Sequence, residues 1–350
     1  MGRQLKRWWP VLALAGLIAY PWLVQASYFH NLGFNVLLFA VMATSWNIMG
    51  GFSGYKSLGH SAFYGLGAYM VAIAANQLGW NPFFSAPVLA IFVAIVAMLL
   101  GWAMLRTHGS AFVIATIAML LIFRILANNL KDITNGAGGL SQPLPLFPPE
   151  HYWVPFYYYM LVWLIIAIAA SAFIRRSRFG MGLLAIRDDE GKAEMVGVNT
   201  TLYKVIAFGI SAYFVGVGGG IWSYGTSHIS PVFAFDIVVG VEMIIMTMLG
   251  GMGTIWGPAL GAFILIPAEE GIRIVFGSTP IHLSILGGVM IAIILFMPRG
   301  ILPTLGDWLS ARRTPQWAHE GAQSMEELRR KQSGDAPAEE PDPTIELEAP

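Results

Sequence analysis

The stretch FFSAPVLAIFVAIVAMLLGWAML occupies residues 83–105 and contains no charged residue. A helix needs about 20 mostly apolar residues to cross the hydrocarbon core of a bilayer, and this stretch supplies them. It therefore predicts a membrane-spanning helix. Similar apolar runs on both sides of it extend the same prediction over most of the chain.

The composition favours a membrane protein over a soluble one. Apolar residues make up 56% of the 350 residues and charged residues 11%, and the mean hydropathy is +0.63. Soluble domains carry about 25% charged residues. Residues 1–131 contain no Asp or Glu, which fits a bilayer because a charge at its centre is costly. The chain has no cysteine, which excludes a disulfide framework, a thiol nucleophile and thiolate metal sites.

Ten apolar runs predict an all-α, polytopic transmembrane helical bundle of about ten spans. The number falls to nine if the ninth run is re-entrant, because Glu269, Glu270 and Arg273 lie in its second half. The eighth run is short unless it begins before Asp236. The runs are residues 10–26, 32–49, 61–78, 83–105, 111–127, 156–174, 205–224, 237–249, 258–276 and 281–297.

The positions of Lys and Arg orient the predicted bundle, because cytoplasmic loops are enriched in both residues. With ten spans, every basic cluster falls on one side, and both termini are predicted to be cytoplasmic. The clusters are Arg3, Lys6 and Arg7; Arg106; Arg175, Arg176 and Arg178; and Arg299, Arg312 and Arg313. The first run ends in Val24-Gln25-Ala26, which also resembles a signal-peptide cleavage site. Cleavage there would leave nine spans with the C-terminus still inside.

This arrangement divides the chain into a membrane domain and a tail. The membrane domain covers residues 1–305, with a long outside loop at 128–155 and a long inside loop at 175–204. Residues 306–350 are polar, contain several prolines and end in acids. This composition predicts a largely disordered tail.

Three segments go beyond generic membrane composition. They are NIMGGFSGYKSLGHSAFYGLGAY at 47–69, RFGMGLLAIRDDE at 178–190 and GGMGTIWGPALGA at 250–262. In this order and spacing they resemble the branched-chain amino acid permease family of ABC importers, and most closely the M type of its two membrane subunits. The resemblance runs from about residue 31 to residue 301. One departure is Tyr55-Lys56, where family members often carry Gln and an aliphatic residue.

The resemblance implies an importer built from several polypeptides in a bacterial inner membrane. This chain would be half of the pore, surrounded by membrane lipid. Its partners would be a second homologous permease subunit, two cytoplasmic ATPase subunits and a periplasmic solute-binding protein. ATP and Mg²⁺ would bind the ATPase subunits, and the sequence agrees because it has no GxxxxGK[ST] phosphate loop. No cofactor, metal, catalytic residue or nucleic-acid partner is expected in this chain.

The inside loop, residues 175–204, is predicted to be the coupling element, the part of the permease that docks on an ATPase subunit. The resemblance assigns this role to it. Acids at the start of a short helix would offset its dipole, and Gly197 could end that helix in a left-handed cap. The alternative is a solvated loop without a partner. The candidate coupling residues are Arg187, Asp188, Asp189, Glu190, Glu194 and Gly197.

The two glycine-rich segments, residues 50–67 and 250–261, are candidates for the pore or its gate. Broken helices near a pore expose backbone groups that need water, solute or side chains as partners, but tight helix packing explains the same glycines equally well. His60 by itself is more typical of a hydrogen-bonded structural histidine than of a proton carrier. The pore candidates are Gly51, Ser53, Gly54, Ser57, Gly59, His60, Gly250, Gly251 and Gly253.

Ionisable residues inside the runs have interface or structural explanations as well as functional ones. Arg124, Asp236 and Glu242 lie toward the outer ends of their runs, where side chains can snorkel to the interface. Glu269 and Arg273 are spaced to pair along one helix.

The resemblance thus implies a permease subunit of an ATP-driven importer, with leucine, isoleucine and valine as solutes. Other amino acids, amides or urea are the alternatives within the family. An ion-coupled secondary transporter is a more distant alternative, and it would need intramembrane carboxylates near mid-depth. A membrane-embedded enzyme is a third, but the histidines are scattered, with none at metal-ligand spacing.

Overall fold

A computed structural model describes residues 14–24, 26–277, 287–288, 291 and 300–304. The chain divides into two units, Met1–Leu302 and Pro303–Pro350. Every element discussed below belongs to the first unit. Most of the predicted tenth span (281–297), the start of the first (10–13) and the predicted tail (306–350) lie outside the described residues.

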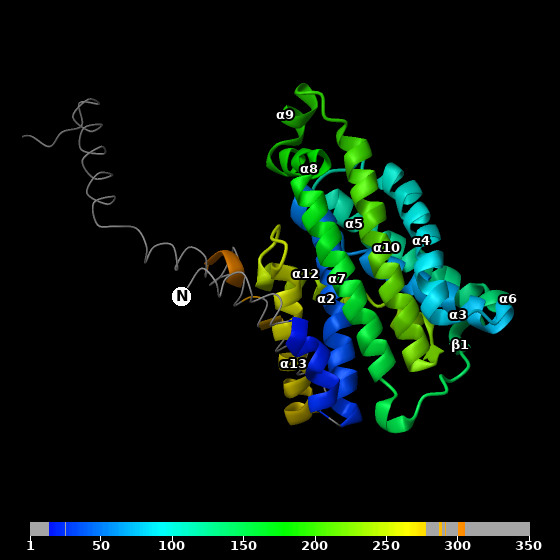
Figure 1. Cartoon of the computed structure of the whole chain (residues 1–350). Helices are drawn as coiled ribbons and strands as arrows, with labels where there is room; N and C mark the ends of the chain where they lie inside the picture. The colour runs from blue at the N-terminus through cyan, green and yellow to red at the C-terminus, as the bar shows by residue number, and fades with distance from the viewer. Residues whose placement is uncertain (1–13, 25, 278–286, 289–290, 292–299, 305–350) are drawn as a thin grey trace, which may run out of the picture. The chain divides into compact units, whose positions relative to one another are not determined.

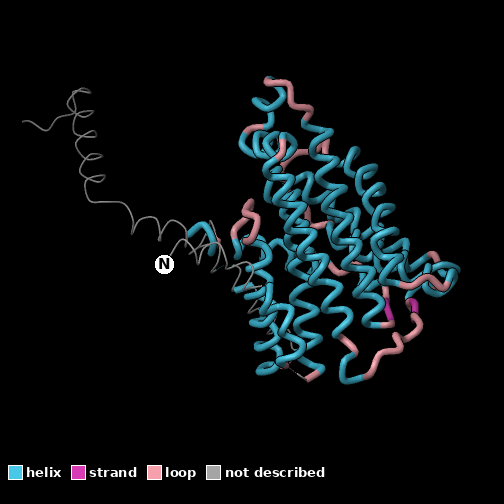
Figure 2. The backbone as a smooth tube through the Cα atoms, viewed as in Figure 1, coloured by secondary structure: helices cyan, strands magenta, loops and turns pink. Residues whose placement is uncertain are grey.

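Long α-helices make up most of the described chain (Figures 1 and 2). The long helices are α2 (Ser27–Ser53), α3 (His60–Leu78), α4 (Pro82–Met104), α5 (Ser110–Asn129), α7 (Val154–Arg176), α10 (Thr200–Thr226), α12 (Ile237–Gly250) and α13 (Gly257–Phe276). The short elements are α6 (Lys131–Thr134), η1 (Gly136–Gly138), β1 (Leu140–Ser141), η2 (Pro149–His151), α8 (Arg178–Asp188), α9 (Glu190–Met195), β2 (His228–Ile229) and α11 (Pro231–Ala234). The all-α prediction is confirmed.

Six of the described helical segments are long and apolar enough to cross a membrane: Ser27–Ser53, Pro82–Met104, Ser110–Asn129, Pro149–Arg176, Thr200–Thr226 and Pro231–Gly250. Each matches a predicted run. The predicted third and ninth runs also form helices, α3 and α13, although α13 carries three charged residues. The first run contributes the shorter apolar helix Leu14–Leu23. The eighth run is lengthened at its start by α11, and Asp236 caps α12 by accepting a hydrogen bond from the Val238 N–H at 3.0 Å.

α2 and α10 lie at the centre of the bundle. In each of these two helices 78% of the apolar stretch is buried inside the protein, compared with 28% in α5. α10 packs against α3 and α4, and α2 packs against α7 and α13 (Figure 1). The α3–α10 contact depends on small residues, because a methyl group at Gly67 would overlap the backbone of Gly216. Small residues allow helix backbones to approach closely in membranes.

The two long predicted loops lie at opposite ends of the bundle, joined by α7 (Figure 1). One end carries α8 and α9, so the predicted inside loop 175–204 is largely helical. The other end carries residues 128–155, where β1 pairs antiparallel with β2 in the register Leu140↔Ile229 and Ser141↔His228. The ribbon is anchored to the bundle because Asn76 Nδ2 donates a hydrogen bond to the Ser141 carbonyl at 2.8 Å.

Candidate coupling and solute sites

α9 is defined by caps at both of its ends. The Asp189 side chain accepts a hydrogen bond from the Lys192 N–H at 3.1 Å at the first turn. At the last turn, the N–H groups of Gly197 and Val198 donate to the carbonyls of Glu194 and Ala193 at 2.9 and 3.0 Å. With Gly197 at φ 89°, this is a Schellman motif. The glycine cap expected from the sequence is therefore present in the structure.

The expectation for Asp188 was wrong in one respect. Asp188 is the last residue of α8 and does not lie at a helix start, because Asp189 adopts an extended conformation and separates the two helices. The other coupling candidates hold the segment together. Glu194 accepts a hydrogen bond from the Thr200 hydroxyl at 2.7 Å, which links the end of α9 to the start of α10.

A polar cluster fastens α9 to the membrane helices. The Lys204 side chain is 2% exposed and pairs with Glu190. Its Nζ also donates to the Tyr55 hydroxyl at 3.1 Å and to the Leu105 carbonyl at 3.2 Å. Tyr55 donates a second hydrogen bond to Glu190, and His108 Nε2 lies 3.5 Å from the same carboxylate. The cluster therefore joins α9 and α10 to the segments that follow α2 and α4.

The electrostatics of this cluster favour an ionised Glu190. Partial burial raises its pKa, but hydrogen bonds from Lys204 and Tyr55 outweigh burial, and the net shift of the Glu190 pKa is downward. Burial and the hydrogen bond to Glu190 raise the pKa of Tyr55, so its hydroxyl remains a donor. Tyr55 was singled out in the sequence because it departs from the family pattern. Its contact with Glu190 could not be inferred from that departure.

Two arginines bring both glycine-rich segments to the same place. Arg187 Nη1 donates to the Gly51 carbonyl at 2.9 Å, and Arg175 donates to the Gly253 carbonyl. Between them, Asn47 accepts from the Gly253 N–H at 2.7 Å and donates to the Thr254 carbonyl at 2.8 Å. The ends of α2 and α12 are thus joined to each other and to α7 and α8. Neither arginine contact is visible in the sequence.

The remaining pore candidates have packing or hydrogen-bonding roles. Gly54 caps the end of α2 with φ 78° and lies against Arg187. The Ser53 hydroxyl donates to the Met49 carbonyl at 2.6 Å, and the Ser57 carbonyl accepts from the Trp46 indole at 2.8 Å. Gly59 leaves no room for a methyl group beside Thr116. These contacts support the packing explanation for this segment.

His60 and the Gly250-Gly251 pair fit the same explanation. His60 is fully buried and bonds through Nε2 to the Ser211 hydroxyl at 2.8 Å, as a structural histidine does. A methyl group at Gly250 would overlap the Gly257 backbone, and Gly251 ends α12 at φ 123°. The described residues contain no group of three or more His, Asp or Glu placed to hold a metal ion.

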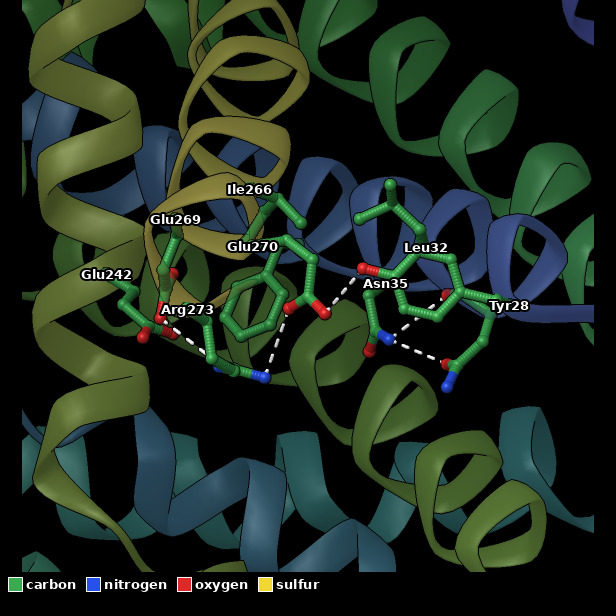
Figure 3. Close-up of a pocket in the computed structure, with 10 residues that line it drawn as sticks. Tyr28, Leu32, Asn35, Glu242, Ile266, Glu269, Glu270 and Arg273 are labelled. Carbon is green, nitrogen blue, oxygen red and sulfur yellow. Dashed lines mark hydrogen bonds and ion pairs between the residues drawn. The ribbon is translucent and has the colours of Figure 1, made fainter. Parts of the chain in front are cut away.

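A second polar site lies at the opposite end, in a pocket of about 210 Å³ between α2, α12 and α13 (Figure 3). Arg273 pairs with Glu269 at 3.5 Å and with Glu270 at 3.2 Å, so the expected pairing along α13 is present and includes a second acid. The expectation that Glu242 reaches the membrane–water interface was wrong. Glu242 is 8% exposed and lines the pocket with these residues, because packing of α12 against α13 turns it inward.

Residues 29–294 match the model of the family described as the permease component of the branched-chain amino acid transport system. The chain belongs to this family. It is therefore a multi-pass membrane protein and a transport subunit rather than an enzyme. In ABC systems of this kind the ATPase is a separate polypeptide, and the permease has no cofactor of its own.

The relatives include both types of permease subunit. The Escherichia coli high-affinity branched-chain amino acid transport system permease protein LivM is 27% identical over 84% of this chain and 74% of its own length. The corresponding LivH protein of Escherichia coli is 27% identical over 75% of this chain and 91% of its own. BraD of Pseudomonas aeruginosa, a permease protein of the same kind of system, is 26% identical over 75% of this chain and 91% of its own. No solved structure matches this chain.

Proposed function

We propose that this chain is the membrane-spanning permease subunit of an ATP-driven, binding-protein-dependent importer for branched-chain amino acids. The observation that carries the proposal is the family match over residues 29–294. The relatives' names refer to branched-chain amino acid transport, which supports leucine, isoleucine and valine as solutes. Other amino acids, amides or urea remain the alternatives within the family.

The proposed complex contains a second, homologous permease subunit, two cytoplasmic ATPase subunits and a periplasmic solute-binding protein. The presence of both LivM and LivH among the relatives supports a pore made from two related chains. We place the pore in a bacterial inner membrane with about ten spans and with both termini in the cytoplasm. The end that carries α8 and α9 is then cytoplasmic, and it holds Arg106, Arg175, Arg176, Arg178 and Arg187. The excess of arginine at this end supports that orientation.

Within this complex, α8 and α9 are the proposed coupling element. An element that transmits an ATPase movement must project from the membrane and be fixed to the helices that it moves. The surface at the end of α9 is exposed: Met195 is 84% exposed and Val196, which follows the helix, is 78% exposed. Its inner side is fastened to α10 through Lys204, and Arg187 of α8 is fastened to the end of α2. This arrangement supports transmission of force from α9 to the pore helices.

Reconstituted transport tests the proposal. Proteoliposomes would contain this chain, its partner subunit and both ATPases, with binding protein outside, ATP inside and labelled leucine as solute. Leucine uptake that requires both ATP and binding protein is expected. Uptake driven by an ion gradient without ATP would overturn the proposal in favour of a secondary transporter. Binding-protein-stimulated ATPase activity without leucine uptake would keep the importer class and change the solute.

The orientation has its own test, because the chain contains no cysteine. Glu150→Cys and Lys192→Cys place single thiols at exposed positions on the two ends of the bundle. In intact cells a membrane-impermeant maleimide should label the variant at position 150 and not the variant at 192. The reverse pattern would contradict the proposed orientation.

A further inference from the structure

The pocket between α2, α12 and α13 lies toward the end that carries residues 128–155. Tyr28 is in the first turn of α2, and Arg273 is near the last turn of α13. Ser27, next to Tyr28, bonds to the Pro149 carbonyl at 3.4 Å. In the proposed orientation this is the outer side of the membrane, where the binding protein would release solute.

Most charged groups of the pocket already have partners (Figure 3). Arg273 pairs with Glu269 and Glu270, and the Tyr28 hydroxyl donates to Glu270 at 2.8 Å. Glu242 differs from these residues. It is 8% exposed and lines the pocket, and it has no hydrogen bond or ion pair to any residue in the described part of the chain. Ionisation of a buried carboxyl group that lacks a hydrogen-bonding partner is costly, so a positive group from outside the chain would stabilise the ionised form of Glu242.

The rest of the lining indicates what kind of molecule carries that positive group. Leu32, Phe39 and Ile266 form an apolar part of the wall, and the Arg273 guanidinium supplies hydrogen-bond donors. Small-molecule sites commonly combine an apolar lining with a few placed polar groups. The volume of about 210 Å³ is below the roughly 300–1,000 Å³ of pockets for drug-sized ligands, which suits a solute as small as one amino acid.

We infer that this pocket is a solute subsite of the permease, in which Glu242 receives the ammonium group of an aliphatic amino acid. The aliphatic side chain packs against Leu32, Phe39 and Ile266, and Arg273 faces the carboxylate of the solute. The inference rests on the proposed function, because it assigns residues to the solute of that same importer. It places an amino acid contact in the permease itself, in addition to recognition by the binding protein.

The test compares Glu242→Gln with Asp236→Asn in the proteoliposome system. Asp236→Asn removes a carboxylate from the start of the same helix and keeps a good cap, since Asn caps helices about as well as Asp. Glu242→Gln should reduce leucine uptake by about tenfold to a hundredfold, the effect of losing one charge-assisted hydrogen bond. Asp236→Asn should transport normally. Stimulation of the ATPase by loaded binding protein should persist in both variants.

Ligand binding to the complex in nanodiscs, without binding protein, provides a readout that a purely structural role would not change. Leucine and isopentylamine, which both carry an ammonium group, should raise the unfolding temperature of the wild type but not that of Glu242→Gln. Isocaproate, which lacks the ammonium group, should have little effect on either. Equal stabilisation of the wild type and Glu242→Gln would overturn the inference.

The outcomes separate this inference from the proposed function. If wild-type uptake requires ATP and binding protein while Glu242→Gln transports normally, the function stands and the subsite is wrong. Loss of ATPase stimulation together with uptake in Glu242→Gln would show a conformational role and overturn the subsite. A wild type whose uptake follows a proton gradient and does not require ATP would overturn both.

Discussion

Arg187 Nη1 donates a hydrogen bond of 2.9 Å to the carbonyl of Gly51, at the last turn of α2. The same guanidinium lies against Gly253, after the end of α12. Arg187 belongs to the proposed coupling element and the two glycines to the proposed pore segments. One side chain therefore joins the parts of the chain that a coupled transporter must move together.

Arg187→Ala should uncouple the proposed element from the pore. Its loss leaves the Gly51 carbonyl without this donor and removes the side chain that spans the ends of α2 and α12, so leucine uptake per ATP hydrolysed should fall by about tenfold. Arg178→Ala is the matched control, because Arg178 is an exposed arginine at the start of the same helix. Equal coupling ratios in the two variants would contradict the role of Arg187.

Lys204→Met should destabilise the α9 end of the protein. Lys204 is buried, and its removal leaves Glu190 without its main cationic partner, at a cost of about 2 kcal/mol. Thermal unfolding in detergent of Lys204→Met, Glu190→Gln and the double variant forms a double-mutant cycle. A clear interaction energy is expected, since residues in one network are not additive. Strict additivity would show that the pair is not coupled.

Acidification should weaken the same cluster. The Glu190 pKa is lowered in the folded protein, so its contribution to stability is full above the ordinary glutamate pKa of about 4.3. That contribution is lost as the pH falls through the lower folded-state pKa. The difference in unfolding temperature between the wild type and Glu190→Gln should therefore shrink as the pH is lowered below about 4.3. A constant difference would show that another group dominates.

Gly67→Ala should disrupt the packing of α3 on α10. An added methyl group would overlap the Gly216 backbone, which cannot move aside as a flexible side chain would. Overpacking of this kind costs about 1–3 kcal/mol, measurable as a lower unfolding temperature. Gly271→Ala in α13 is the control, because its methyl group would enter open space and alanine favours helices. Similar losses in both variants would argue against the close approach.

Gly197→Val should disturb the end of α9 through backbone strain alone. No heavy atom lies within 4 Å of an added Cβ, but φ is 89°, and left-handed backbone costs a side-chain-bearing residue about 1–2 kcal/mol. Uptake per ATP should fall while membrane insertion is kept. Gly197→Asn should be milder, since Asn tolerates this region. Normal coupling in Gly197→Val would count against a role for the α9 cap.

Most helices of the described chain, and their order, could be predicted from the sequence alone. Apolar runs such as residues 83–105 predict spans because helix formation in a membrane depends on local composition, and Gly197 could be recognised as a cap because a left-handed turn is also a local property. The three motif segments were sufficient to indicate the family. The Glu269–Arg273 pair was also predictable, since both residues lie on one helix four positions apart.

Which side chains contact one another depends on the tertiary structure. Lys204 and Tyr55 are 149 residues apart in sequence, and Arg187 and Gly51 are 136 apart. Such contacts depend on how helices pack, and no local pattern encodes them. The environment of Glu242 could not be predicted from the sequence either. Its position near a predicted span end suggested an interface residue, whereas packing of α12 against α13 determines that its carboxylate faces a pocket.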